Sequence, residues 1–192
     1  MEQSRYTGST SLHNIFERYI ICAIVRKLNE AYSALGRSGV TVGVISFYDS
    51  QVGDLRKAVK ALRNEGKLKA LKVDVNTVDR FQGKEKQIII TSLVCNTKRG
   101  NASRHVAAFE RINVAFSRAQ NLLIIVGAKA LYEKLNVNIP DMETGEQRSA
   151  HIYQNIIDDI ARGGALIPGE ALISDEEVEA IREEYDKEAN EL

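Results

Sequence analysis

The chain carries Val-Asp-Arg-Phe-Gln-Gly-Lys-Glu at residues 78–85 and Glu-Arg-Ile-Asn-Val-Ala-Phe-Ser-Arg-Ala at residues 110–119. We call these stretches the first block and the second block. An apolar run follows each of them, at residues 88–94 and at residues 122–127. Continuous apolar runs of this length are typical of strands at the centre of a parallel sheet. Both blocks are therefore expected in connections near strand ends, and α/β proteins bind ligands beyond the carboxyl ends of their strands.

The rest of the chain alternates between strand-like and helix-like patterns. Buried strands are expected over residues 40–48, 71–78, 88–94 and 122–127. Apolar residues at three- and four-residue spacing predict helices over residues 12–35, 49–63, 106–119 and 130–135. Asp49 or Ser50 is expected to cap the second of these helices. The alternation predicts an α/β fold, with a doubly wound parallel sheet flanked by helices.

Charge is distributed unevenly along the chain, although the formal net charge is zero. Residues 1–139 contain 22 Lys and Arg against 11 Asp and Glu, whereas residues 140–192 contain 4 against 15. A basic body attracts the phosphate backbone of nucleic acids. The same basic side chains would equally serve to solvate helix faces, and charge alone does not decide between these interpretations.

The acidic residues 140–192 are predicted to form a linker and a helical C-terminal appendage to a domain made by residues 1–139. Residues 140–146 have the composition of a polar linker, and residues 152–161 have an amphipathic helical pattern. Ser174, with Glu177 three residues later, predicts the start of a further helix. The favoured interpretation of this tail is a solvated or frayed helix. Folding back onto the basic body as a phosphate mimic is the open alternative.

The composition indicates a globular protein of one domain, or of one domain with an appendage. The 192 residues are 44% hydrophobic and 27% charged, which allows a sizeable core. The apolar runs are too short for a membrane span, and the first twenty residues lack a signal-peptide pattern. An intracellular location is expected, cytoplasmic or, in a eukaryote, nuclear. Cys22 and Cys95 lie in apolar sequence, which predicts buried reduced thiols, and no metal site is expected.

The two blocks contain residue types that suit nucleotide chemistry. Gly83 allows close backbone approach to a ligand, and the Glu85 carboxylate can accept a hydrogen bond from a ribose hydroxyl or an attacking water. Taken alone, this pattern is more often a simple turn. An arginine such as Arg118, placed against a γ-phosphate, contributes roughly 10³–10⁵ in rate. Taken alone, it is more often a partner of a helix dipole or of a surface ion pair.

Four segments together resemble a known family. Residues 75–90 look like motif V of the Upf-like and senataxin-like superfamily 1 helicases, and residues 110–127 resemble motif VI with the strand behind it. Residues 42–52 and 11–17 are similar to the segments that open the second RecA-like domain of that group. The resemblance covers about residues 8–130, with the segments in the family's order. It implies a RecA-like doubly wound sheet and an ATP-dependent helicase activity for the whole protein.

The resemblance also implies roles for individual residues. The arginine finger is Arg118, which with Glu85 forms the catalytic pair. The nucleotide-facing group comprises Gln82, Gly83, Glu85 and Arg118. The candidates that face the nucleic-acid strand are Thr77 and Asp79, with Ser46 and Tyr48 as weaker ones. For Tyr48, a role as a turn residue is about equally favoured.

The sequence departs from the family in several ways. Phe47 stands where the family usually has proline, Ser117 where it has threonine, and Gln120 where it has a basic residue. The sequence contains no Gly-x-x-x-x-Gly-Lys-Ser/Thr loop and no preceding Asp-Glu metal-binding strand. ATP and Mg²⁺ are therefore expected to be bound mainly by a missing N-terminal RecA-like domain. This chain alone is not expected to hydrolyse ATP.

Three hypotheses follow for the function. In the first, the chain is the C-terminal motor domain of a helicase, with single-stranded DNA or RNA and the first RecA-like domain, in cis or in trans, as its partners. In the second, it is a free-standing, non-catalytic module that binds nucleic acid or protein. In the third, it is an unrelated α/β domain with chance matches.

Overall fold

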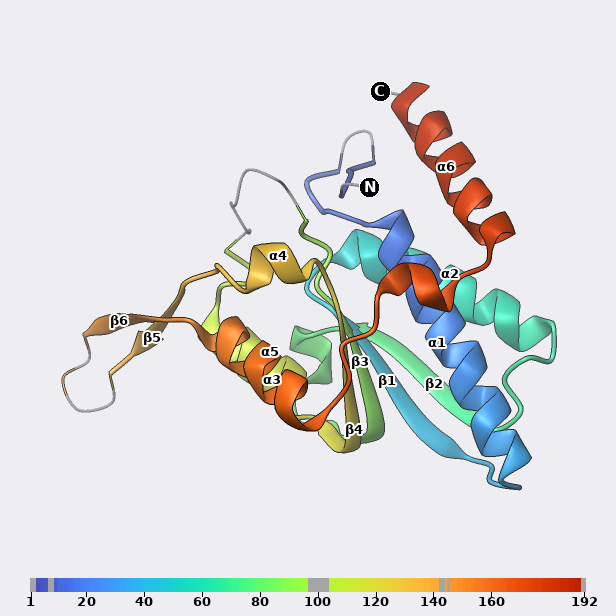
Figure 1. Cartoon of the computed structure of the whole chain (residues 1–192), viewed down its shortest axis with the longest axis horizontal. Coiled ribbons are helices and arrows are strands. Elements are labelled where there is room, and N and C mark those ends of the chain that lie inside the picture. The colour runs from blue at the N-terminus through green and yellow to red at the C-terminus, as the bar shows by residue number, and fades with distance from the viewer. Residues whose placement is uncertain (1–2, 7–8, 97–103, 142–143, 145, 191–192) are drawn as a thin grey trace.

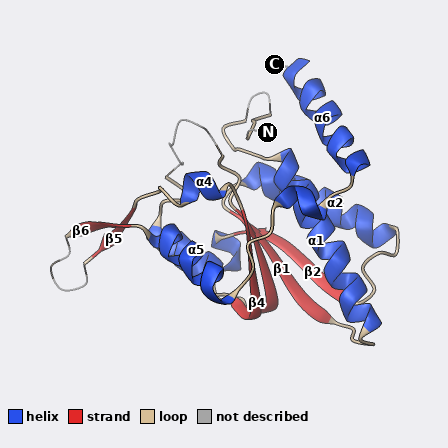
Figure 2. Cartoon of the chain, viewed as in Figure 1, coloured by secondary structure: helices blue, strands red, loops and turns tan. Residues whose placement is uncertain are grey.

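The centre of the molecule is a four-stranded parallel sheet in the order β2-β1-β3-β4 (Figure 1). The computed structural model describes residues 3–6, 9–96, 104–141, 144 and 146–190. The strands are β1 (Val40–Ser46), β2 (Leu71–Thr77), β3 (Lys86–Ser92) and β4 (Ala119–Val126). Helices cover both faces of the sheet (Figure 2). The predicted RecA-like α/β architecture is thus confirmed.

The four strands are parallel, so their carboxyl ends lie together on one side of the sheet and their amino ends on the opposite side. We call these two sides the carboxyl edge and the amino edge. At the carboxyl edge, Ser46 pairs with Thr77 on one side and with Ser92 on the other. At the amino edge, Lys86 pairs with Ala119. β4 begins at Ala119 rather than at residue 122, because backbone pairing continues through exposed polar residues that carry no apolar signal.

One face of the sheet is covered by α1 (Ile15–Ala34) and α2 (Asp49–Asn64). Asn14 caps α1, because its side-chain oxygen accepts the backbone N–H of Glu17 at 3.1 Å. The predicted capping of α2 by Asp49 or Ser50 is wrong. Tyr48 holds the N-cap position, and the Ser50 backbone N–H instead donates to the Ser11 hydroxyl at 3.1 Å. The acceptor therefore comes from a segment far away in the sequence.

The other face is covered by three helices and a short 3₁₀ turn. They are α3 (Phe109–Phe116), α4 (Lys129–Tyr132), α5 (Ile152–Gly163) and η1 (Asp79–Phe81). Two buried tyrosines tie this layer to the backbone. The Tyr132 hydroxyl donates to the Leu93 carbonyl at 3.0 Å, and the Tyr153 hydroxyl donates to the Val106 carbonyl at 2.7 Å. Each buried hydroxyl thus has the partner that its desolvation requires.

The C-terminal region departs from expectation in two places. An antiparallel hairpin of β5 (Val137–Pro140) and β6 (Gln147–Ala150) extends away from the sheet (Figure 2). Residues 142, 143 and 145 of the predicted linker lie outside the described residues. These strands are short and mostly polar, so no alternating pattern marks them. β5 also runs across the predicted domain boundary between residues 139 and 140.

The acidic tail is a packed helix and not merely a solvated or frayed one. η2 (Gly169–Leu172) and α6 (Asp175–Asn190) lie against α1, and Ile181 of α6 is fully buried. The predicted start of this helix is confirmed. The Ser174 hydroxyl accepts the Glu177 backbone N–H at 3.2 Å, and the Glu177 carboxylate accepts the Ser174 backbone N–H at 3.0 Å.

The described residues also answer smaller questions. Cys22 and Cys95 are buried free thiols, as predicted. None of the helices in this part of the chain is long and apolar enough to cross a membrane.

Candidate active site

The first block crosses the sheet from one edge to the other. β2 and β3 lie on opposite sides of β1, so the connection between them passes over β1 on the face that carries α3. It begins where the Val78 backbone N–H donates to the Ser46 carbonyl at 3.0 Å, at the carboxyl edge. It ends at Lys86, at the amino edge. The exposed residues 82–85 are thereby delivered to the amino edge.

Two features fix the path of this crossing. Phe81 is fully buried and packs against Gly43 of β1, where an added Cβ would lie 2.6 Å from the aromatic Cζ. Gly83 has a φ of +76°, which favours glycine, and the Lys84 N–H donates to the Phe81 carbonyl at 3.0 Å. The turn thus exposes Gly83 and its neighbours while Phe81 anchors them.

The second block meets the first at the amino edge. α3 ends at Phe116, with Ser117 as its C-cap, and Arg118 leads directly into β4. The Lys86 backbone N–H donates to the Arg118 carbonyl at 3.1 Å. The Gln120 side-chain amide donates to the Glu85 carboxylate at 3.3 Å. The predicted catalytic pair, Arg118 and Glu85, therefore lies immediately before the starts of two neighbouring strands, β4 and β3.

The Arg118 side chain is half-buried and close to the helix that precedes it. Its Nε donates to the Val114 carbonyl in the last turn of α3, at 3.3 Å. This is the contact with a helix C-terminus that an ordinary structural role would give. Within the described residues, no contact is recorded for its two terminal guanidinium nitrogens, which leaves their donors for a ligand.

An ion pair joins the two blocks a second time, on the side of the carboxyl edge. The Arg111 guanidinium donates through Nε to Asp79 Oδ1 at 3.0 Å and through Nη2 to Asp79 Oδ2. Hydrogen bonds from Arg111 hold the pKa of the Asp79 carboxyl below its usual value. Arg111 also contacts His105 Nδ1 at 2.7 Å. Asp79 was predicted to face a nucleic-acid strand, and here its carboxylate is already paired.

The other three residues predicted to face the strand are buried at the carboxyl edge. Ser46 is fully buried, and its hydroxyl donates to the Ser92 carbonyl at 3.2 Å. Thr77, its neighbour in the sheet, is 7% exposed. The Tyr48 hydroxyl lies 2.9 Å from the Cys95 sulfur. The structure thus separates these residues from Arg118 and Glu85, which lie at the opposite edge of the sheet.

This separation corrects one general expectation. Ligands of doubly wound sheets usually bind beyond the carboxyl ends of the strands. Arg118 and Glu85 instead precede β4 and β3, at the amino edge. The reason is that both residues immediately precede a strand, and all strands of this parallel sheet begin at the amino edge.

Sequence reasoning missed a buried acid beneath the carboxyl edge. The Glu17 carboxylate accepts the Val94 backbone N–H at 3.0 Å and the Ser92 hydroxyl at 2.7 Å. Burial raises the pKa of Glu17 to about 7. Val94 has a φ of +68°, a left-handed backbone that β-branched residues rarely adopt. The Asn-x-x-Glu spacing at residues 14–17 would have signalled the helix cap, but not this contact with a segment distant in the sequence.

Comparison with known proteins decides the family. The family model described as an AAA domain matches residues 1–130, which is more than half of the chain. The chain belongs to the superfamily 1 helicases of the Upf-like and senataxin-like group. The third hypothesis, an unrelated α/β domain, is therefore wrong.

Three relatives illustrate the similarity to superfamily 1 helicases. The chain is 29% identical over 125 residues to the DNA replication ATP-dependent helicase/nuclease dna2 of Schizosaccharomyces pombe. The aligned residues cover 65% of this chain and 8% of that protein. It is 34% identical over 125 residues to the helicase sen1 of the same organism, with 65% of this chain and 7% of that protein covered. It is 30% identical over 149 residues to the probable helicase MAGATAMA 3 of Arabidopsis thaliana, with 77% and 18% covered. The chain thus spans less than a fifth of the length of each.

The amino edge of this helicase domain offers donors that suit phosphate oxygens. Arg118, Lys84 and the backbone N–H of Gly83 lie on the loop and strand start described above. Such cationic and backbone donors match the charge and geometry of a nucleotide phosphate. In the part of the chain that the structure describes, no group of His, Cys, Asp and Glu side chains could hold a metal ion.

Proposed function

We propose that this chain is the second motor domain of an ATP-dependent DNA or RNA helicase, which contributes the arginine finger and part of the nucleic-acid track. The observation that carries the proposal is the junction of the two blocks at the amino edge. There the Lys86 N–H meets the Arg118 carbonyl at 3.1 Å, and Gln120 contacts Glu85 at 3.3 Å. Two segments that are separate in the sequence form one polar surface.

ATP and Mg²⁺ are held mainly by the first RecA-like domain in this proposal. When that domain closes against the amino edge, Arg118 releases the Val114 carbonyl and reaches the γ-phosphate. Its permanent charge and planar fork stabilise negative charge on the transferred group. This lowers the activation free energy by about 4–7 kcal/mol. Glu85 accepts a hydrogen bond from a ribose hydroxyl or from the attacking water, and the Gly83 N–H faces a phosphate oxygen.

α3 supplies a direct connection between the nucleotide and the nucleic-acid strand. Arg111, near the start of α3, pairs with Asp79 towards the carboxyl edge. Arg118 follows the last turn of the same helix. A shift of Arg118 towards ATP would therefore move Asp79 and, through β2, Thr77. We propose that this helix couples ATP hydrolysis to movement of a single strand along the carboxyl edge.

The second candidate function is a non-catalytic module that binds nucleic acid or protein. The absence of a phosphate-binding loop from these 192 residues favours it. The intact Arg118 and Glu85 favour the motor domain instead, since a binding module has no use for either. The intact mass of the native polypeptide separates the two. A longer product with a Gly-Lys-Ser/Thr loop supports the motor, and a native chain of this length supports the module.

The motor proposal is tested by Arg118→Ala in the protein that carries both RecA-like domains. ATP turnover should fall about 10³-fold or more, while affinity for a single-stranded oligonucleotide stays within about twofold of wild type. Arg162→Ala is the matched control, because Arg162 lies on α5 and pairs with Asp159 at the surface. Turnover at the wild-type rate in Arg118→Ala would contradict the proposed role.

A further inference from the structure

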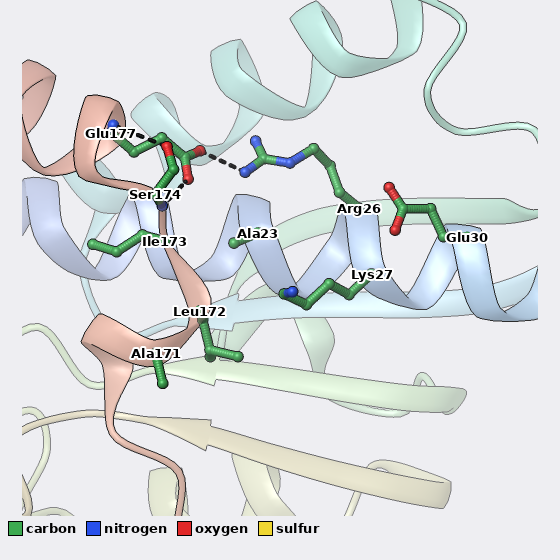
Figure 3. Close-up of a pocket in the computed structure, with 9 residues that line it drawn as sticks. All are labelled: Ala23, Arg26, Lys27, Glu30, Ala171, Leu172, Ile173, Ser174 and Glu177. Atoms are coloured by element: carbon green, nitrogen blue, oxygen red, sulfur yellow. Dashed lines mark hydrogen bonds and ion pairs between the residues drawn. The ribbon is translucent and has the colours of Figure 1, made fainter.

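α6 is attached to α1 by a face that is mostly charged. Glu177 accepts a hydrogen bond from Arg26 at 2.5 Å, and Glu184 pairs with Arg18 (Figure 3 shows the first pair). These two acids lie seven residues apart and therefore point from the same side of the helix.

A third acid continues this charged face towards the end of α6. The Glu188 carboxylate accepts the Ser4 hydroxyl at 2.8 Å and lies 3.5 Å from the His13 ring nitrogen Nε2. The contacting face of α6 thus places a carboxylate opposite a polar or basic group in three successive places.

The apolar part of this contact is small by comparison. Ile181 is the fully buried residue of α6, and Val178 and Tyr185 are half-buried. A cavity of about 340 Å³ lies between α1 and the segment that leads into α6 (Figure 3). It is lined by charged and polar residues and by apolar ones: Arg26, Lys27, Glu30, Ser174, Glu177, Ala23, Ala171, Leu172 and Ile173. The side chains of the two ion pairs are 21–34% exposed, so water screens these pairs in part, and α6 has one fully buried side chain. A helix held in this way is more easily displaced than one with a continuous apolar face.

The part of α1 that α6 covers is basic. We define the α1 basic face as Arg18 and Arg26, the two arginines that pair with α6. Arg18 and Arg26 are eight residues apart, which places them about 12 Å apart along one side of the helix. Lys27, nine residues after Arg18, is exposed on the opposite side of the helix. Two cations spaced as Arg18 and Arg26 are can contact two phosphates of one nucleic-acid backbone.

We propose that the α1 basic face is a phosphate-backbone contact for single-stranded nucleic acid, and that α6 covers it as a displaceable phosphate mimic. The proposal rests on the proposed function, because the ligand is the strand that the motor would move. Charge complementarity supports it: residues 1–139 carry an excess of 11 positive charges and residues 140–192 an excess of 11 negative charges. A phosphate that replaces Glu184 or Glu177 keeps each guanidinium paired, so the exchange leaves no cation without a partner.

The test compares two triple variants of the full chain that remove the same charge. E177Q/E184Q/E188Q changes the three acids that contact α1 and the N-terminal segment, and glutamine at residue 177 retains the helix-capping pattern. E176Q/E179Q/E183Q changes three exposed acids on the outer side of α6. Affinity for a labelled twenty-nucleotide oligothymidine and oligouridine is measured between about 50 and about 200 mM salt.

The contacting variant should bind the oligonucleotide roughly tenfold more tightly than wild type at the lowest salt, and the outer variant much less so. Two added phosphate contacts should steepen the slope of log affinity against log salt by about 1.4. Adding R18Q/R26Q to the contacting variant should abolish the gain. Equal gains in both triple variants would overturn the proposal, since net charge alone would then account for the effect.

Three further outcomes separate the possible failures. If wild type and both variants bind the strand with the same affinity, the α1 basic face is not a contact, while the proposed function stands. If no variant binds oligothymidine or oligouridine, the proposed nucleic-acid track is itself contradicted. An equal gain in affinity for a polyglutamate chain of matched charge would indicate an acidic protein segment as the occupant and overturn the assignment to nucleic acid.

Discussion

The ring of Phe81 occupies the space beside Gly43, where a Cβ would lie 2.6 Å from the aromatic Cζ. Phe81 belongs to the first block and Gly43 to the central strand β1. This contact lets the connection from β2 to β3 lie flat on the sheet and holds residues 82–85 at the amino edge. A glycine in a buried strand is otherwise unfavourable, so its presence reflects the close approach of Phe81.

Gly43→Ala is therefore expected to destabilise the fold. The added methyl group must displace Phe81 or the Ile89 side chain, and overpacking of this kind costs about 1–3 kcal/mol of the free energy of unfolding. Gly53→Ala is the control, because a Cβ there meets no atom within 4 Å and helix propensity should raise stability slightly. Urea unfolding measures both variants. Equal stability of Gly43→Ala and wild type would show that Phe81 does not depend on this space.

The buried Glu17 predicts a pH dependence of stability. Its pKa is about 7 in the folded chain against 4.5 ordinarily, because burial disfavours the charged carboxylate. Between these two pH values the folded state holds more protons than the unfolded state. The contribution of Glu17 to the free energy of unfolding is therefore fully present below about pH 4.5 and is lost as pH rises to about 7. The change is about 3 kcal/mol.

Glu17→Gln should remove this decline, because glutamine has no proton to lose in this range. The measurement is chemical denaturation of wild type and variant at several pH values, followed by the difference in their free energies of unfolding. That difference cancels the contributions of all other acids. A constant difference from pH 4.5 to 7 would mean that Glu17 titrates normally.

Loss of the ion pair between Asp79 and Arg111 should weaken the coupling between single-strand binding and ATP turnover, with little loss of folding stability. The Asp79 side chain is 63% exposed, and pairs at the surface contribute about 0–1 kcal/mol. Asp79→Asn should therefore unfold almost like wild type. In a protein with both RecA-like domains, the stimulation of ATP turnover by single strands should fall severalfold, because the ion pair between α3 and the first block is lost.

Glu133→Gln provides a matched comparison for Asp79→Asn. Glu133 pairs with Lys129 at 2.9 Å on the surface of α4, away from both blocks. This variant should keep normal stimulation by single strands. If Asp79→Asn also keeps it, the ion pair does not transmit the effect of ATP.

The strands and most helices could be predicted because their signals are local. The apolar run at Ile88–Ile90 is fully buried in the structure, as its continuous hydrophobicity indicates. The capping of α2 could not be predicted, because the acceptor for the Ser50 N–H is Ser11, 39 residues earlier. The packing of α6 depends on ion pairs with α1 that no local pattern encodes.

The residues of the candidate site could be named from the sequence, but their placement could not. Nothing in the first block indicates that β1 lies between β2 and β3, and this order makes the connection cross β1 and bury Phe81 against it. Likewise, the pairing of Asp79 with Arg111 follows from the position of α3 above the crossing, not from the sequence around either residue. Strand order is a property of the whole sheet, so short motifs leave it open.

The most direct test of the proposed function is a structure of the protein with both RecA-like domains, bound to a non-hydrolysable ATP analogue and Mg²⁺. We expect the Arg118 guanidinium to have left the Val114 carbonyl and to lie about 2.7–2.9 Å from an oxygen of the γ-phosphate. If Arg118 still donates to Val114 while its terminal nitrogens point away from the bound nucleotide, it is not the arginine finger, and the amino edge is not the nucleotide-facing surface.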